Sequence, residues 1–271
     1  MKKFALLGNH IDYSLSPQLH QMISDRMGKP CNYEIVDAMD SFYGALERIK
    51  DEGYEGFNIT IPYKEEMLKH VDEVTEHAKG IGSINTVTVN DGKWVGDNTD
   101  GLGFVKGLGL RGCSVTGMRV LVIGAGGAAR GIVHALLTSG VKQVLLYNRS
   151  TKKRNELFSI LSKQFKDHRM MVVDDYSGIV VDLVINTTPV GGPHFPGERV
   201  IDLEKMTVSH VADIVYKPHK TPLIEQATAL DKKVFHGIDM LVCQAVLAQE
   251  IWQGETVSDE AIEEIIHELI G

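Results

Sequence analysis

The chain has 271 residues, of which 43% are hydrophobic and 24% charged, and its formal net charge is −8. This composition is close to that of average globular proteins, so it excludes disordered and fibrous classes, and the length favours two domains. The negative charge disfavours a nucleic-acid partner, because nucleic-acid binding needs a basic face. The expected partner is a small molecule, and any bound anion must be held by a local site.

Cysteine and histidine spacing limits the metal and redox chemistry. Cys31, Cys113 and Cys243 lie far apart and form no Cys-x-x-Cys pair, which predicts buried thiols in a reducing cytosol. The 11 histidines show no metal-ligand spacing, so no metal site is expected. The apolar run at residues 4–7 is too short for a signal peptide, and no run approaches the ~18 residues of a membrane span. We therefore expect a cytoplasmic protein without membrane contact.

The first 101 residues alternate short apolar runs with helical ones. The pattern predicts helices at residues 17–27 and 41–51, and strands at 4–7, 33–36 and 56–61. Asn90-Asp91-Gly92, between alternating segments at 86–89 and 93–95, predicts a hairpin. This is an α/β layout.

A cleaner series begins at Arg119. Helices start at Gly126 and Thr151, and apolar strands are predicted at residues 120–123, 144–147, 181–185 and 211–215. Repeated βαβ units imply a parallel sheet with helices on both faces. A long apolar helix at 238–252 precedes an amphipathic one that Ser258 would cap. We expect two α/β domains, the second a Rossmann-type parallel sheet, with an active-site cleft between them.

A glycine-rich loop follows the first strand of the second series. Residues 124–129 read Gly-Ala-Gly-Gly-Ala-Ala, directly between an apolar strand and a helical run. A dinucleotide-binding loop needs this context: Gly124 permits the turn, Gly126 the close approach of a pyrophosphate, and Ala129 tight helix packing. The alternative is a turn that binds nothing. The candidate cofactor-binding residues are Gly124, Ala125, Gly126, Gly127 and Ala128.

The end of the second strand bears on the choice of cofactor. An NAD site places Asp or Glu there for the ribose 2′-hydroxyl, whereas this strand ends in Asn148-Arg149-Ser150. Arg149 offers a planar cation for a 2′-phosphate. Residues 152–154, Lys-Lys-Arg, fall in the expected first helical turn, where cations oppose the helix dipole. An ordinary charged surface is the alternative, but the pattern favours NADP.

Polar blocks in the first domain suggest substrate chemistry. Ser14 and Ser16 stand ahead of a helix, where hydroxyls and the helix dipole favour a carboxylate; alternatively Ser16 is a plain N-cap with Pro17 at N1. Lys64 ends the block Asn-Ile-Thr-Ile-Pro-Tyr-Lys and is expected in the first turn of a helix, where its charge is disfavoured. A lysine placed where its charge is disfavoured suggests a functional role, although many surface lysines have no function.

Two further polar clusters lie at the ends of the predicted hairpin. Residues 82–86 read Gly-Ser-Ile-Asn-Thr, and residues 96–101 read Gly-Asp-Asn-Thr-Asp-Gly. Each could be turn chemistry alone, because Gly, Asn and Asp are turn formers.

In order and spacing, these blocks resemble the shikimate dehydrogenase family over essentially the whole chain. The family is similar in its Ser-x-Ser, Asn-x-Thr-x-Pro-x-Lys, Gly-x-x-Asn-Thr and Gly-x-Asn-Thr-Asp blocks, followed by an NADP loop. Further matches are the Asn-Thr-Thr-Pro-Val-Gly block at 186–191, Asp-Ile-Val-Tyr at 213–216, and Gly-Ile-Asp-Met-Leu-Val-Cys-Gln at 237–244. Ser150 is a small departure, since the family often has Thr there, but both residues cap helices.

The resemblance implies a role for each block. It implies a substrate-binding catalytic domain at residues 1–101, an NADP-binding Rossmann domain at 102–237, and C-terminal helices at 238–271 that pack back on the first domain. The substrates would be shikimate and 3-dehydroshikimate, interconverted in aromatic amino-acid precursor biosynthesis by a monomer or homodimer. The substrate carboxylate would be held by Ser14, Ser16 and Tyr216, and the ring hydroxyls by Thr60, Lys64, Asn85, Asp100 and Gln244.

The reacting C3 oxygen would lie between Lys64, as general acid, and Asp100, as its orienter. NADPH would deliver hydride from a nicotinamide near Gly237 and Met240, with Asn148, Arg149, Lys153 and Thr187 as further cofactor contacts. Gln244, which interrupts an apolar helix, is expected to be a buried amide with partners.

Two other functions stay open at this point. A quinate or broad quinate/shikimate dehydrogenase shares most of these blocks and often uses NAD, but Arg149 without an acid at Asn148 argues against NAD. A non-catalytic metabolite-binding homologue is the other alternative, and the presence of both Lys64 and Asp100 argues against it.

Overall fold

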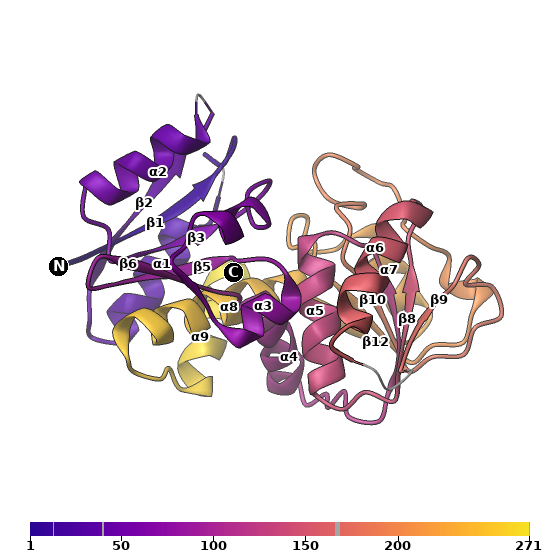
Figure 1. Cartoon of the computed structure of the whole chain (residues 1–271). Helices are drawn as coiled ribbons and strands as arrows, with labels where there is room; N and C mark the ends of the chain where they lie inside the picture. The colour runs from indigo at the N-terminus through magenta and orange to yellow at the C-terminus, as the bar shows by residue number, and fades with distance from the viewer. Residues whose placement is uncertain (13, 40, 166–168, 271) are drawn as a thin grey trace. The chain divides into compact units, whose positions relative to one another are not determined.

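The computed structural model describes residues 1–12, 14–39, 41–165 and 169–270 (Figure 1). The chain divides into two compact units, Met1–Thr99 with Val242–Gly271, and Asp100–Leu241. Each unit contains one six-stranded sheet. Both units mix helices with strands, as the alternating sequence pattern predicts.

The sheet of the first unit is mixed. Its strand order is β2-β1-β3-β5-β6-β4, and the strands are β1 (Lys2–Gly8), β2 (Cys31–Asp37), β3 (Gly56–Ile59), β4 (Glu73–Val74), β5 (Thr86–Asn90) and β6 (Lys93–Asp97). The first three run parallel, whereas β5 pairs antiparallel with both β3 and β6. The predicted hairpin is confirmed: Asp91 (φ 50°) and Gly92 (φ 78°) both have the positive φ that a tight type I′ turn requires.

Helices cover this sheet because alternate strand residues point to opposite faces. In β1, Ala5 and Leu7 join one buried cluster, and Phe4 and Leu6 join another with Trp252. The helical elements are α1 (Ser16–Arg26), α2 (Phe42–Asp51), the 3₁₀ turn η1 (Glu66–Lys69), α3 (Glu76–Ile81) and α9 (Asp259–Ile270). The long helix α8 (Gly237–Gln253) was predicted over nearly this span.

The second unit has a fully parallel sheet. Its order is β12-β11-β10-β7-β8-β9, built from β7 (Arg119–Ile123), β8 (Gln143–Tyr147), β9 (Met170–Val172), β10 (Leu183–Asn186), β11 (His210–Asp213) and β12 (Lys233–His236). Counted along the chain from β7, this is the 3-2-1-4-5-6 order of the Rossmann fold. The Rossmann-type prediction is therefore confirmed.

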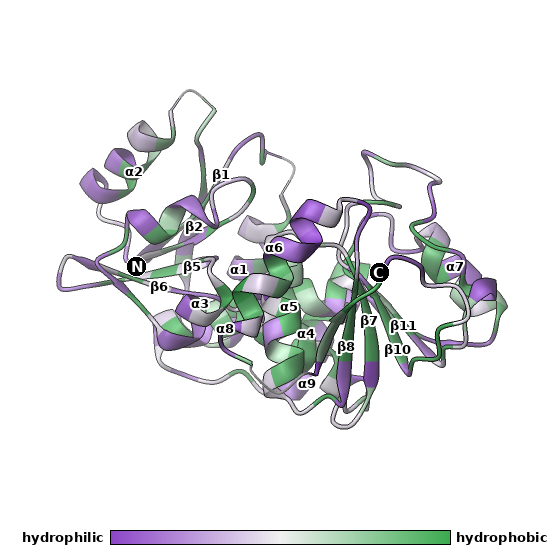
Figure 2. Ribbon diagram, turned by 45° about the vertical axis from the view of Figure 1, so that its right-hand side comes forward, coloured by the Kyte–Doolittle hydropathy of each residue, from purple (hydrophilic) through white to green (hydrophobic). Residues whose placement is uncertain are grey.

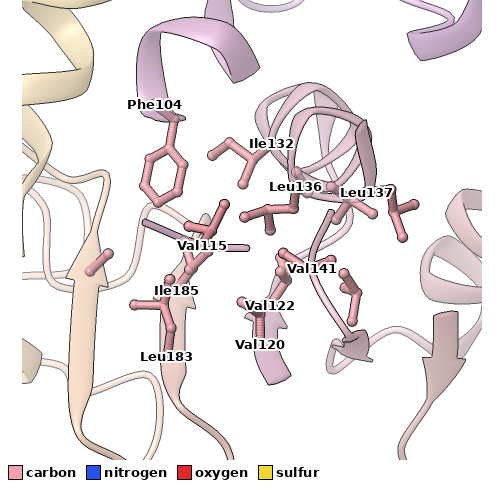
Figure 3. Packing of buried hydrophobic residues seen from close by; sticks show 14 of the residues in the cluster. Phe104, Val115, Val120, Val122, Ile132, Leu136, Leu137, Val141, Leu183 and Ile185 are labelled. Carbon is pink, nitrogen blue, oxygen red and sulfur yellow. The ribbon is translucent and has the colours of Figure 1, made fainter. Parts of the chain in front are cut away.

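Apolar residues fill both faces of this sheet. Val120 and Val122 pack with Ile132 of helix α5 (Gly127–Thr138), whereas Leu121 and Ile123 pack with Leu223 on the other face. Figure 3 shows the first of these clusters, and the strands are drawn largely in the hydrophobic colour in Figure 2. The helices are α4 (Asp100–Leu110), α5 (Gly127–Thr138), α6 (Thr151–Ser162) and α7 (Pro222–Ala229), with a short 3₁₀ turn η2 (Leu203–Lys205).

Helix α4 forms although its sequence is rich in glycine. A Cβ on Gly101 would collide with the carbonyl of Gly131 in α5, and one on Gly107 would crowd the backbone of Asp239. The glycines therefore let α4 pack closely against its neighbours, and this packing outweighs their poor helix propensity.

Candidate active site

The glycine loop lies at the carboxyl end of β7, where the strand order of the second sheet reverses between β7 and β10. Open α/β sheets bind ligands at this switch point. Gly124 has a φ of 119°, and a Cβ there would collide with Oγ1 of Thr187. A Cβ on Gly126 would meet no atom within 4 Å. Gly126 is the N-cap of α5, so the missing side chain leaves open space at a helix N-terminus, which suits a pyrophosphate.

The third position of the motif also behaves as predicted. Ala129 is fully buried in the cluster between α5 and the sheet. A larger residue would push the helix away from the strands, so a small side chain keeps the N-terminus of α5 close to the loop.

The end of β10 meets the glycine loop. Thr187 donates from its backbone N and from Oγ1 to the carbonyl of Ile123, at 2.8 and 2.7 Å. The Asn186 side-chain oxygen accepts from the backbone N and Oγ1 of Thr188, at 3.0 and 2.7 Å. Thr187 is thus fixed beside Gly124 of the glycine loop.

The candidate phosphate-binding residues follow β8. Arg149 and Lys153 are exposed, and Nδ2 of Asn148 donates to the carbonyl of Ser150 at 3.0 Å. Ser150 caps α6 by accepting from the backbone N of Lys153. Arg154 does not belong to this exposed cationic group, contrary to our interpretation. It is 4% exposed, its Nη2 pairs with Asp174 at 2.7 Å, and its Nη1 donates to the carbonyl of Val173.

Ser14 and Ser16 stand together at the start of α1. Oγ of Ser14 donates to Oγ of Ser16 at 3.1 Å and accepts from the backbone N of Ser16 at 3.2 Å. Both residues are half-buried. The alternative of Ser16 as N-cap is wrong, because the N-cap is Leu15, without a side-chain bond, and Ser16 is the first helical residue. The two hydroxyls form a pair at the helix N-terminus.

The expected helix at Lys64 is absent. Residues 61–65 form turns, and only the four-residue 3₁₀ element η1 follows, beginning at Glu66. A sustained helix dipole therefore does not act on Lys64, and the inference of a stability cost at this residue is withdrawn. The half-buried Lys64 is fixed by its backbone carbonyl, which accepts from Ile84 N at 2.8 Å.

This bond ties Lys64 to the block that holds Asn85. The backbone N of Ile59 donates to the Asn85 carbonyl at 2.8 Å, so β3 and its following residue Thr60 are held to the same block. Asn85 is 2% exposed; its Oδ1 accepts from the backbone N of Thr99 at 2.8 Å, and its Nδ2 donates to Thr99 Oγ1 at 3.0 Å. Backbone bonds therefore hold the segments that carry Thr60 and Lys64 to the segment that carries Asn85, whose side chain bonds to Thr99.

Asp100 comes directly after Thr99 and is the first residue of α4. It is 5% exposed. An acidic side chain interacts favourably with a helix N-terminus, so the start of α4 supports an aspartate at this position. The sequence patterns did not predict α4, and this support was therefore missed.

Tyr216 lies in the loop that follows β11 and is half-buried. Gly237, the first residue of α8, sits against this loop: a Cβ there would collide with the carbonyl of Ile214. Gly237 and Met240 also line a small cavity of about 10 Å³ in the second unit. The absence of a side chain at Gly237 thus allows the loop that carries Tyr216 to pass close to the first residue of α8.

Gln244 is not the buried amide that we expected. It is half-exposed on α8, whereas the fully buried amide of that helix is Gln249. Gln249 Nε2 lies 3.0 Å from Nδ1 of His20, a ring stacked on Tyr33 at 4.0 Å between centroids. Gln244 follows Met240 by four positions and Gly237 by seven, so the three residues share one stripe of α8.

Asp213 is a buried carboxylate for which the sequence suggested only membership of a block. It is 1% exposed at the end of β11 and accepts hydrogen bonds from Asn186, Val215 and Thr221. Burial raises the pKa of its carboxyl group to about 6, against the opposing effect of these bonds. The available signal was the position of this acidic residue at the end of an apolar run, because open α/β sheets bind ligands beyond the carboxyl ends of their strands.

In the described part of the chain, no group of three or more His, Cys, Asp or Glu side chains could hold a metal ion. Among the same residues, no helix is long and apolar enough to cross a bilayer. Cys31, Cys113 and Cys243 are buried thiols that belong to no disulfide, and their burial is as predicted.

A parallel sheet in Rossmann order, with a glycine loop at its switch point, defines a dinucleotide-binding α/β protein. Comparison with known families narrows this class. Residues 6–87 match the model of the shikimate dehydrogenase substrate binding domain, and residues 110–215 match that of shikimate / quinate 5-dehydrogenase. The chain belongs to the shikimate dehydrogenase family.

Individual relatives agree over the full length. The chain is 34% identical to a shikimate dehydrogenase (NADP(+)) of Staphylococcus epidermidis over 97% of both chains. A crystal structure of shikimate 5-dehydrogenase from Thermus thermophilus with NADP(H) and shikimate is 31% identical, with a TM-score of 0.88 over 99% of both chains. Quinate dehydrogenase from Corynebacterium glutamicum with NAD is 28% identical, with a TM-score of 0.85 over 98% of this chain and 99% of that chain.

Proposed function

We propose that this protein is an NADP-dependent shikimate dehydrogenase, which reversibly reduces 3-dehydroshikimate to shikimate in the biosynthesis of aromatic amino-acid precursors. The observation that carries the proposal is a group of segments joined by hydrogen bonds: those of Thr60 and Lys64 are held to that of Asn85, whose side chain bonds to Thr99. It lies in the unit that matches the family's substrate-binding domain, and the other unit carries the dinucleotide loop. Full-length similarity to a relative named for NADP(+) supports the cofactor.

The residues around the loop fit NADP. Open space at Gly126 leaves room for a pyrophosphate, and exposed Arg149 follows β8 without a carboxylate that would repel a 2′-phosphate. When bound, NADPH supplies the hydride. The residues that would hold it are Gly124, Ala125, Gly126, Gly127, Ala128, Asn148, Arg149, Lys153, Thr187, Gly237 and Met240.

The chain's own residues bind the substrate and move the proton. Ser14, Ser16 and Tyr216 hold the carboxylate, and Thr60, Asn85 and Gln244 bind ring hydroxyls. Lys64 gives its proton to the reacting carbonyl oxygen during reduction and takes it back during oxidation; such general acid catalysis contributes ~10²–10⁴ in rate. Asp100, at the start of α4, orients the ammonium group of Lys64.

Activity with quinate and NAD is the second candidate, because a quinate dehydrogenase with NAD shares this fold. Steady-state kinetics with shikimate or quinate, each paired with NADP or NAD, separates the candidates. We expect the highest kcat/KM for shikimate with NADP. A higher value for quinate with NAD would reassign the substrate and cofactor, and ligand binding without any turnover would indicate a metabolite-binding homologue.

We further propose a cytoplasmic protein that works as a monomer or homodimer. Three buried thiols that form no disulfide suit a reducing compartment. Light scattering during size-exclusion chromatography measures the oligomeric state, and a mass above that of two chains would contradict the proposal.

A further inference from the structure

Asp213 is a buried carboxylate that takes no part in the proposed proton transfer. Its Oδ1 accepts from Nδ2 of Asn186 at 2.9 Å and from the backbone N of Val215 at 3.0 Å, and its Oδ2 accepts from Oγ1 of Thr221 at 2.7 Å. One donor from the end of β10 and two from the loop that follows β11 therefore converge on one side chain. Burying an ionisable group costs desolvation free energy even when hydrogen bonds satisfy it, so we expect the buried Asp213 carboxylate to have a function.

Each donor belongs to a segment that bears on the site. Asn186 holds Thr188 through its side-chain oxygen, and Thr188 follows the cofactor-facing residue Thr187. Val215 directly precedes Tyr216. Thr221 caps α7 by accepting from the backbone N of Ile224 at 3.3 Å, and it ends the loop that Tyr216 begins.

We propose that Asp213 is a positioning residue that holds the cofactor-facing loop (residues 186–190) and the substrate-clamp loop (residues 214–221) in a fixed relation. Shikimate and NADP binding thereby depend on a single carboxylate. This inference deepens the proposed function and rests on it. The converging groups are all donors, so both oxygens must accept, and only an ionised carboxylate provides acceptors alone. Asparagine at this position would turn one amide N–H group towards a donor.

Other ionisable groups face the same region. His236, the register partner of Asp213 on β12, and Asp239 of α8 line the small cavity with Asp213. His219 stacks on His236 at 4.0 Å between centroids, and Arg111 pairs with Asp239 at 2.8 Å. Lys220 lies beside Thr221 in the chain. With its pKa raised to about 6, the Asp213 carboxyl is ionised at neutral pH and becomes neutral in mild acid.

The test compares Asp213→Asn with Asp202→Asn. Asp202 is a matched control because it also accepts from a side-chain amide, Gln226 at 2.7 Å, and a backbone N, Glu204 at 3.2 Å, but bonds to neither loop. For Asp213→Asn we expect KM for shikimate and Kd for NADP each to rise about 10-fold, since buried donors lose their acceptor. For Asp202→Asn both constants should stay within about twofold of wild type, as for most surface substitutions.

Hydrogen exchange reports on the loops without requiring turnover. The backbone amides of Val215 and Thr188 should exchange faster in Asp213→Asn than in Asp202→Asn. The comparison applies when the two variants have equal denaturant midpoints of unfolding, so that global stability does not account for the difference. In wild type, KM for shikimate should rise as the pH falls through about 6, because the Asp213 carboxylate becomes protonated. In Asp213→Asn this rise should be weaker, because asparagine does not titrate. Unchanged KM, Kd and amide exchange in a folded Asp213→Asn protein would overturn the proposal.

If Asp213→Asn does not fold, variants of Thr221 test the proposal instead. Thr221→Val removes one donor to the carboxylate, and Thr221→Ser retains it. We expect Thr221→Val to shift KM and Kd in the same direction by about threefold, and Thr221→Ser to resemble wild type. Equal constants in the two Thr221 variants would contradict the proposal. If wild type binds NADP but does not oxidise shikimate, the proposed function fails, whereas NADP affinity and amide exchange still test Asp213.

Discussion

Replacing Gly124 and Gly126 by alanine should have opposite consequences. At Gly124, the φ of 119° strains any L side chain, and the new Cβ would collide with Thr187 Oγ1. Strain and overpacking together are worth ~2–5 kcal/mol, so Gly124→Ala should lower the free energy of unfolding by that amount. At Gly126, φ is −92° and ψ −171°, which alanine adopts freely, and the Cβ meets nothing within 4 Å. The free energy of unfolding should therefore change by less than ~0.5 kcal/mol.

NADP binding, unlike stability, should be sensitive to the replacement of Gly126. If the pyrophosphate approaches Gly126, the added methyl group occupies its space, and displacement costs ~1–3 kcal/mol, or roughly 5- to 150-fold in Kd. Urea unfolding and calorimetric titration with NADP measure the two effects separately. The control is Gly109→Ala in α4, where a Cβ also meets nothing within 4 Å. That change should leave NADP affinity unaltered.

A double variant tests the collision itself. Thr187→Ala removes Oγ1, so the loss of stability in Gly124→Ala combined with Thr187→Ala should be smaller than the sum of the single losses. Additive losses would refute the close contact between the two residues. A Gly126→Ala protein that binds NADP within twofold of wild type would refute the reasoning about the pyrophosphate.

Three further predictions follow from single side chains. Arg149→Ala should weaken NADP binding by ~1.5–3 kcal/mol through loss of a charge-assisted phosphate contact; equal losses for NAD and NADP in titrations would contradict this role. Tyr216→Phe should raise KM for shikimate and leave NADP affinity nearly unchanged, and an unaltered KM would remove Tyr216 from the carboxylate site. Burial lowers the pKa of His20 from 6.5 to about 3, so the unfolded chain binds a proton that the folded chain excludes. The free energy of unfolding should then fall as pH drops below about 6.5, by ~2 kcal/mol at pH 5; His20→Gln should flatten this decline, and an unchanged slope would exclude His20 as its source.

The second unit was largely predictable because its strands are buried on both faces. Continuous apolar runs such as residues 120–123 mark such strands, and the glycine loop indicates the ligand-binding edge. The short strand β9, with two of its three residues exposed, has no comparable pattern. Helix α4 was missed because its glycines suggest a loop, whereas close packing against α5 stabilises it.

The candidate site was predictable as a set of blocks but not as geometry. A polar block after Pro62 suggested a helix at Lys64, yet the chain makes turns before η1, because local propensity is a weak guide over so few residues. Sequence also does not reveal which amide of α8 is buried: Gln244 is half-exposed, and Gln249 packs beside His20. The convergence of Asn186, Val215 and Thr221 on Asp213 depends on the register of β10 with β11.

The central claim is that Lys64 transfers the proton in shikimate oxidation by NADP. The most direct measurement is kcat and KM for shikimate in wild type, Lys64→Ala and the control Lys69→Ala, which removes an exposed lysine of η1. We expect Lys64→Ala to lower kcat by ~10²–10⁴ with a much smaller change in KM, and Asp100→Asn to add little to this loss in the double variant. Lys69→Ala should behave as wild type. A Lys64→Ala enzyme that turns over shikimate within a few-fold of wild type would contradict the mechanism.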